Sequence, residues 1–149
     1  LTAHLGEKFF DENLVKICLD LLNDPVHQVR LSAINNLSNL IGRFGIDWCR
    51  NRLIVPVLAH LTTNQNYLRR TGLGHVVEVI TPLGSEELFN EVSLPALKAL
   101  VTDPVPNVRL SIARSLLNVL AGVSSFSVKT PISMFNTLPK RLCRLLKFN

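Results

Sequence analysis

The sequence is poor in charged residues and in long apolar runs, and each shortage excludes a class of protein. Charged residues make up 18% of the 149 residues and apolar residues 47%, a balance too apolar for a disordered linker. The richest apolar run, Leu53 to Ala59, has seven residues and contains Pro56. Because a membrane helix needs about 18 apolar residues, we expect no membrane span. No basic stretch precedes an apolar one at the start, so we expect no signal peptide.

Cysteine and methionine are also scarce. Cys18, Cys49 and Cys143 lie far apart without a Cys-x-x-Cys pair, which indicates free thiols and no disulfide framework or zinc site. Free thiols suit a reducing compartment, so we expect a cytoplasmic protein, with the nucleus as a second location. Met134 is the only methionine, and we therefore expect the chain to be a piece of a longer protein.

Acidic residues are absent from residues 123–149, which therefore carry the whole net charge of +5. The neutral body argues against a basic groove for nucleic acid, so nucleic-acid binding is disfavoured. Four basic residues of this segment have helical spacing on one face, which favours the solvated face of an unfinished repeat. An acidic protein surface, membrane headgroups and nucleic acid are its other candidate partners. The four residues are Lys140, Arg141, Arg144 and Lys147.

An internal repeat organises the rest of the chain. Three segments each place an arginine six residues after an Asp or Asn, and the arginines are 40 and then 39 residues apart. Pro56 and Pro95 stand eight residues before the second and third segments, where the first copy has Lys16. A period near 40 is typical of two-helix solenoid repeats. The segments are Asp24 to Arg30, Asn64 to Arg70 and Asp103 to Arg109.

Apolar residues recur at spacings of three and four on both sides of each segment, which predicts a helix before and after each turn. We expect helix pairs at 11–22 with 26–41, 47–61 with 66–81, and 86–101 with 105–121, after a helix end at 1–4. Asp24 and Asp103 are expected to cap the second helices, with Pro25 and Pro104 at their first positions. No segment alternates with period two, so we expect an all-α chain. One solenoid domain follows, with repeats at about 8–43, 44–83 and 84–122 and a partial repeat at 123–149.

The order of several motifs resembles HEAT repeats, and more narrowly the C-terminal repeats of the scaffolding A subunits of protein phosphatase 2A. These motifs are Asp47-Trp-Cys, Ile54-Val-Pro, Asn66-Tyr-Leu-Arg-Arg and Asp103-Pro-Val-Pro-Asn-Val-Arg, and the resemblance covers about residues 5–121. The regulatory subunit 1 of protein phosphatase 4 is a similar HEAT protein and stays an alternative. So do a karyopherin-like transport protein and a nucleic-acid-associated HEAT protein.

The resemblance implies a right-handed α-solenoid whose intra-repeat turns form a ridge that holds a protein serine/threonine phosphatase catalytic subunit. Tyr67 leads the candidate contacts, because a tyrosine at a turn offers a large area at low entropic cost. Packing of Tyr67 on its own repeat is the alternative. The turn positions that match the family are Val26, His27, Gln28, Asn66, Tyr67, Leu68, Arg69, Val105, Pro106 and Asn107.

The remaining singled-out residues favour structural roles. We expect a ladder in which each turn arginine binds a turn Asp or Asn of its own or the adjacent repeat. Trp48 is expected in the core. Gly72 and Gly74 stand where the family has bulkier apolar residues, and indicate either a close approach of helices or a hinge. The ladder residues are Asp24, Arg30, Asn64, Arg70, Asp103 and Arg109.

Catalytic signals are weak. The four histidines show no metal-ligand spacing, and the serines lack a Gly-x-Ser-x-Gly motif. We therefore expect no enzyme, cofactor, metal or small-molecule substrate.

Overall fold

A computed structural model describes residues 2–122 of the chain, and within this range it contains helices and no strand. The expected all-α solenoid is confirmed. The partial repeat, the basic segment and Cys143, all within residues 123–149, lie outside the described residues.

The described residues form three antiparallel helix pairs. In each pair a first helical stretch leads into an intra-repeat turn, and a second stretch returns alongside it. The first pair consists of α1 (Thr2–Asn13), α2 (Val15–Leu22) and α3 (His27–Phe44). The second consists of α4 (Ile46–Cys49), η1 (Arg50–Ile54), α5 (Val55–Thr63), α6 (Tyr67–Arg70), α7 (Gly72–Ile80) and η2 (Thr81–Leu83). The third consists of α8 (Glu86–Leu88), η3 (Phe89–Ser93), α9 (Leu94–Val101) and α10 (Pro106–Gly122).

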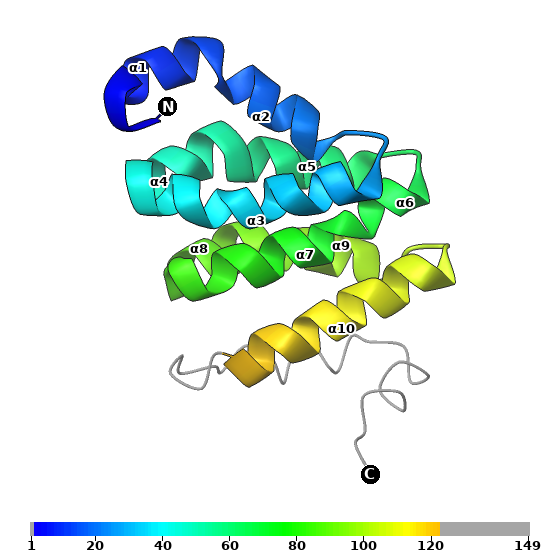
Figure 1. Cartoon of the computed structure of the whole chain (residues 1–149). Coiled ribbons are helices and arrows are strands. Elements are labelled where there is room, and N and C mark those ends of the chain that lie inside the picture. Colours follow the sequence, from blue (N-terminus) through cyan, green and yellow to red (C-terminus); the bar gives the residue numbers. More distant parts are fainter. Residues whose placement is uncertain (1, 123–149) are drawn as a thin grey trace.

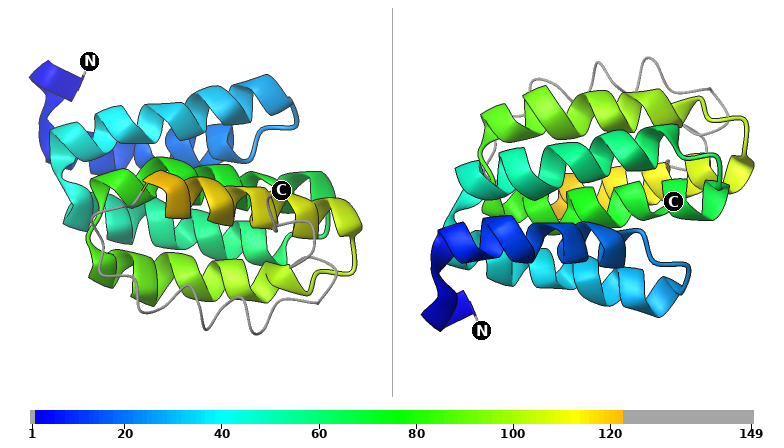
Figure 2. Two further views of the ribbon diagram at one scale, coloured as in Figure 1. Left: turned by 90° about the horizontal axis from the view of Figure 1, so that it is seen from below. Right: turned by 90° about the horizontal axis from the view of Figure 1, so that it is seen from above.

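The pairs stack in two layers. Figure 1 shows α3, α7 and α10 one below another, with α5 and α9 behind them, and Figure 2 shows the same layers from above and below. The three intra-repeat turns lie at one end of the stack, and the connections between pairs lie at the other. Apolar side chains from both layers form one core, which includes the fully buried Leu37, Leu53, Leu73, Leu97 and Ile112. Stacking therefore brings the turns into a row.

A wider helical turn precedes each of the two repeat prolines. The π-helical segments η1 and η3 end two residues before Pro56 and Pro95, respectively. A proline ring clashes with the carbonyl four residues earlier in a regular α-helix, so widening the preceding turn accommodates it. The repeated proline thus shapes the first helix of both pairs in the same way.

Two expectations about helix limits were wrong. No helix ends near residue 4, because α1 continues to Asn13, and Phe10 near its end packs against Phe44 and Trp48. The second helices α3 and α10 begin at His27 and Pro106, three residues after Asp24 and Asp103, so neither Asp caps its helix. Pro25 and Pro104 likewise lie two residues before the first helical positions that were expected of them.

Candidate protein-binding ridge

The three intra-repeat turns share one local structure. In each turn the first Asp or Asn accepts a hydrogen bond through Oδ1 from the backbone N–H two residues later. The distances are 2.7 Å for Asp24 to Val26, 2.9 Å for Asn64 to Asn66, and 2.8 Å for Asp103 to Val105. Such Asx turns fix the backbone before the helix starts. Asp24, Asn64 and Asp103 thus shape the turns and do not cap the helices that follow them.

Each turn arginine binds the main chain of its own turn. The Nη1 of Arg30 donates to the carbonyls of Asp24 and Pro25, at 2.7 and 3.0 Å. Arg70 and Arg109 donate to the two corresponding carbonyls of their turns, at 2.7 and 3.1 Å and at 2.6 and 3.1 Å. Each arginine thus binds the main-chain carbonyl of the Asp or Asn that opens its own turn, and that of the residue after it.

A carboxylate pairing joins the second repeat to the third. Arg70 donates through Nε and Nη2 to the two carboxylate oxygens of Asp103, at 2.7 and 3.1 Å. Burial by itself raises the pKa of Asp103. The hydrogen bonds from Arg70 and the Val105 N–H, with the charges of Arg70 and Arg109, nevertheless hold that pKa below its ordinary value. Asp103 is therefore a charged, buried link between two turns.

Arg69 joins the second repeat to the first. Its Nη1 donates to the main-chain carbonyl of Asn23, at the start of the preceding turn. Arg69 was expected to contact a partner, and the structure shows its side chain half-buried against the neighbouring repeat. The second turn is thus bonded on both sides, through Arg69 and through Arg70.

The remaining predicted contact residues are mostly exposed. Val26, Tyr67 and Leu68 present 55%, 38% and 52% of their surface to solvent, although all three are apolar or aromatic. Val105 is half-buried, and the side chain of Asn66 caps α6 by accepting from Leu68 N–H at 3.0 Å. Exposed with them are His27, Gln28, Asn66, Pro106 and Asn107. We call this row of turn residues, 26–28, 66–68 and 105–107, the turn ridge.

The other residues singled out in the sequence lie away from the ridge. Trp48 is half-buried in an aromatic cluster, with ring centroids 5.6 Å from Phe10 and 4.7 Å from Phe44. Gly74 marks a close approach of helices, because a Cβ there would lie 2.1 Å from Oγ of Ser115. A Cβ at Gly72 would meet nothing within 4 Å, so packing does not require a glycine there.

Two ion pairs between repeats were missed in the sequence. Arg52 pairs with Asp11, and Arg50 pairs with Glu91, each at 2.6 Å. The partners are 41 residues apart in both pairs. Opposite charges one repeat length apart are the signal that could have found them.

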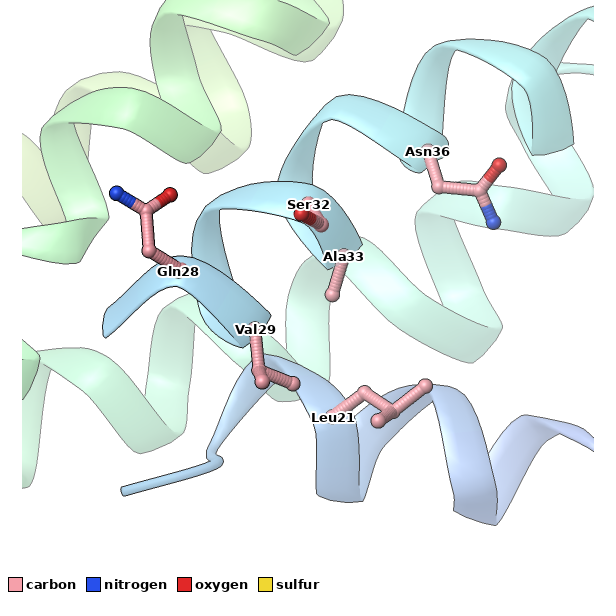
Figure 3. A pocket seen from close by; sticks show the side chains of 6 residues that line it. All are labelled: Leu21, Gln28, Val29, Ser32, Ala33 and Asn36. Atoms are coloured by element: carbon pink, nitrogen blue, oxygen red, sulfur yellow. The ribbon is translucent and has the colours of Figure 1, made fainter. Parts of the chain in front are cut away.

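A groove of about 450 Å³ lies beside α2 and α3. Figure 3 shows Leu21 of α2 and Val29 and Ala33 of α3 lining this groove. One repeat later, the positions of Leu21 and Ala33 hold Leu61 and Leu73, both buried in the core. The groove is therefore formed by the positions that stacking buries one repeat later, and it carries no feature that points to a ligand.

Chemistry that would support catalysis is weak in the described part of the chain. Within it, no group of three or more His, Cys, Asp or Glu side chains could hold a metal ion. Burial raises the pKa of the Cys49 thiol to about 11 and also raises that of Cys18, which disfavours the thiolate of each. None of the helices in residues 2–122 has the length and apolarity to cross a membrane.

Comparison with known proteins confirms the resemblance. The HEAT repeat family matches residues 14–44. Over 96 residues the chain is 32% identical to the regulatory A subunit of protein phosphatase PP2A from Saccharomyces cerevisiae, a match that covers 64% of this chain and 15% of the yeast protein. Over 62 residues it is 35% identical to the protein of the same name in Schizosaccharomyces pombe, covering 42% of this chain and 10% of that protein. The chain thus matches a small part of each relative's length.

Proposed function

We propose that this chain is a non-catalytic scaffold segment that binds a protein serine/threonine phosphatase catalytic subunit through its turn ridge. The observation that carries the proposal is the exposure of Val26, Tyr67 and Leu68 on adjacent turns, in a protein whose relatives are named as regulatory A subunits of phosphatase PP2A. We place it in the cytoplasm, where a reducing environment keeps Cys18 and Cys49 as free thiols.

The frame beneath the ridge supports this function. The Asx turns and the arginine bonds of each repeat fix the backbone that carries the exposed side chains. Cross-repeat bonds from Arg69 and Arg70 hold the second turn against both neighbours. Little ordering is then needed on association, so little of the binding free energy is lost to conformational entropy. The ridge thus acts as a preformed surface for a folded partner.

The exposed residues have the composition of an interface centre. Tyr67 and Leu68 supply apolar area beside the exposed polar side chains of His27, Gln28 and Asn107. Protein interfaces combine an apolar centre, in which tyrosine is enriched, with a polar rim. The centre of the ridge therefore lies at the second turn.

The test measures the affinity of the full chain for the purified catalytic subunit of phosphatase 2A. Tyr67→Ala and Leu68→Ala should each weaken binding, and the loss expected for Tyr67→Ala, as the anchor of the interface, is about thirtyfold. Leu83→Ala is the matched control, because Leu83 is also exposed, at 44%, but lies in the connection between repeats. Equal loss in all three variants, or no binding by the unaltered chain, would refute the proposal.

A parallel titration with the phosphatase 4 catalytic subunit distinguishes the two scaffold alternatives. Tighter binding of phosphatase 2A is expected from the names of the relatives. Tighter binding of the phosphatase 4 catalytic subunit would leave the turn ridge as the binding surface but make phosphatase 4 the partner.

A further inference from the structure

A recess of about 300 Å³ is lined by residues of the second helices α7 and α10. It lies beside the segment that contains Gly72 and Gly74, the positions where the phosphatase family has bulkier apolar residues. Its lining combines one apolar side chain, Leu110, with polar and charged ones. The polar lining residues are His75, Glu78, Asn107, Ser111, Arg114, Ser115 and Asn118.

The floor of the recess is a polar contact between the two helices. Ser111 Oγ donates to the carbonyl of Thr71 at 3.0 Å, and Gly74 lies against Ser115. One repeat earlier, the positions of Gly74 and Ser115 hold Ile34 and Val76, which are both buried in the apolar core. Stacking of repeats therefore does not by itself require small polar residues at this joint.

The two charged groups of the recess, the Glu78 carboxylate and the Arg114 guanidinium, differ in their bonding. Asn118 Nδ2 donates to Glu78 Oε1 at 3.1 Å, and His75 Nδ1 lies 3.7 Å from Oε2 of the same carboxylate. Arg114 is exposed, and no hydrogen bond or ion pair to another residue of the described range 2–122 occupies its guanidinium. Among residues 2–122, therefore, the Arg114 guanidinium has no bonded partner, whereas the Glu78 carboxylate accepts from Asn118.

We propose that this recess binds an acidic side chain, Glu or Asp, of an extended peptide segment. The guanidinium of Arg114 would bind the carboxylate through two parallel hydrogen bonds, the geometry that suits an arginine. Leu110 would contact an apolar neighbour in the peptide, and the amide of Asn107 would meet its main chain. The recess is distinct from the centre of the turn ridge at Tyr67 and shares Asn107 with its margin, so either site can fail without the other.

The test is a titration of the full chain with the acetylated and amidated peptide Ser-Leu-Glu-Leu-Ser, followed by the ¹H–¹⁵N signals of the arginine and asparagine side chains. Binding should shift the Arg114 Nε–H signal saturably. The peptide with Gln in place of Glu should bind at least about tenfold more weakly, since it lacks the charge that strengthens the hydrogen bonds.

Arg114→Gln should lower the affinity for the Glu peptide by a similar factor and leave the affinity for the Gln peptide unchanged. Arg43→Gln is the matched control, because Arg43 is an exposed arginine of α3 outside the recess, and it should change neither affinity. Equal affinity for the two peptides, absence of saturable shifts, or an equal loss with Arg43→Gln would overturn the proposal. Inorganic phosphate that reproduces the shifts at the same concentration would also overturn it, by indicating a small-anion site.

Discussion

Replacing Asp103 by Asn removes one charge from the link between the second and third turns. The side chain of Asp103 is 4% exposed and that of its partner Arg70 is 12% exposed, so water can replace little of the lost interaction. The Asn oxygen can still accept from Val105 N–H, as Asn64 does from Asn66 N–H in the second turn. The substitution therefore tests the cross-repeat pair with the Asx turn intact.

The expected cost follows from the bonds that are lost. Asp103 accepts two charge-assisted hydrogen bonds from Arg70, and an Asn amide can accept only one of them. A hydrogen bond to a charged group contributes about 1.5–3 kcal/mol, so we expect a loss of about 2 kcal/mol in the free energy of unfolding. For a chain of this size that corresponds to a fall of about 4–8 °C in Tm.

Urea and thermal unfolding measure this loss, with Asp24→Asn as the control. Asp24 occupies the same place in the first turn and accepts the same main-chain bond, without a carboxylate pairing to a neighbouring repeat. Asp24→Asn should change stability by less than about 0.5 kcal/mol. Equal destabilisation by the two substitutions would refute the cross-repeat explanation.

Acid should remove the contribution that the Arg70–Asp103 pair makes to the free energy of unfolding. The pKa of Asp103 is lower in the folded chain than its ordinary value, so the pair stabilises the fold fully above the unfolded pKa of about 3.9. That contribution is lost as the pH falls through the folded pKa. The difference between the unaltered chain and Asp103→Asn should therefore shrink below about pH 4. A difference that acid leaves unchanged would contradict the assignment.

Further predictions concern packing. Gly74→Ala should lower the free energy of unfolding by about 1–3 kcal/mol, because its Cβ would clash with Ser115, whereas Gly72→Ala should raise it by up to about 1 kcal/mol. Equal stability of the two variants in urea would contradict the close approach. Trp48→Ala removes one of the three rings of the aromatic cluster and should cost about 2 kcal/mol in thermal unfolding, less than the roughly 3–5 kcal/mol of a fully buried tryptophan because Trp48 is half-buried. Cys49 should react with iodoacetamide at pH 8 much more slowly than a free cysteine until urea unfolds the chain, as followed by mass spectrometry, since its pKa is about 11.

The helix pairs and the row of turns could be predicted from the sequence, because they depend on the spacing of residues. An arginine six residues after an Asp or Asn, repeated near every 40 residues, places three turns at equivalent points of stacked pairs. The apolar spacing on either side then predicts which faces are buried. Val26, Tyr67 and Leu68 could be singled out as candidates for the same reason, since they fall inside the turns.

The details of the turns could not be predicted, because one residue type serves several bonds. Asp is common both at helix caps and in Asx turns, so Asp24 was wrongly expected to cap α3, whose N-cap is Val26. The reach of Arg69 to the carbonyl of Asn23 depends on how closely two repeats stack. Whether Gly74 is a hinge or a close contact depends on Ser115, one repeat away in the chain.

Hydrogen–deuterium exchange on the full chain, with and without saturating phosphatase 2A catalytic subunit, tests the central claim most directly. Binding through the turn ridge predicts slower exchange of the backbone amides of residues 26–28 and 65–68 and of Val105 and Asn107, the turn positions that are not proline. The connections between repeats, near residues 45 and 84, should exchange at unchanged rates. Slower exchange confined to those connections, or no change anywhere at saturation, would contradict the claim that the turns hold the partner.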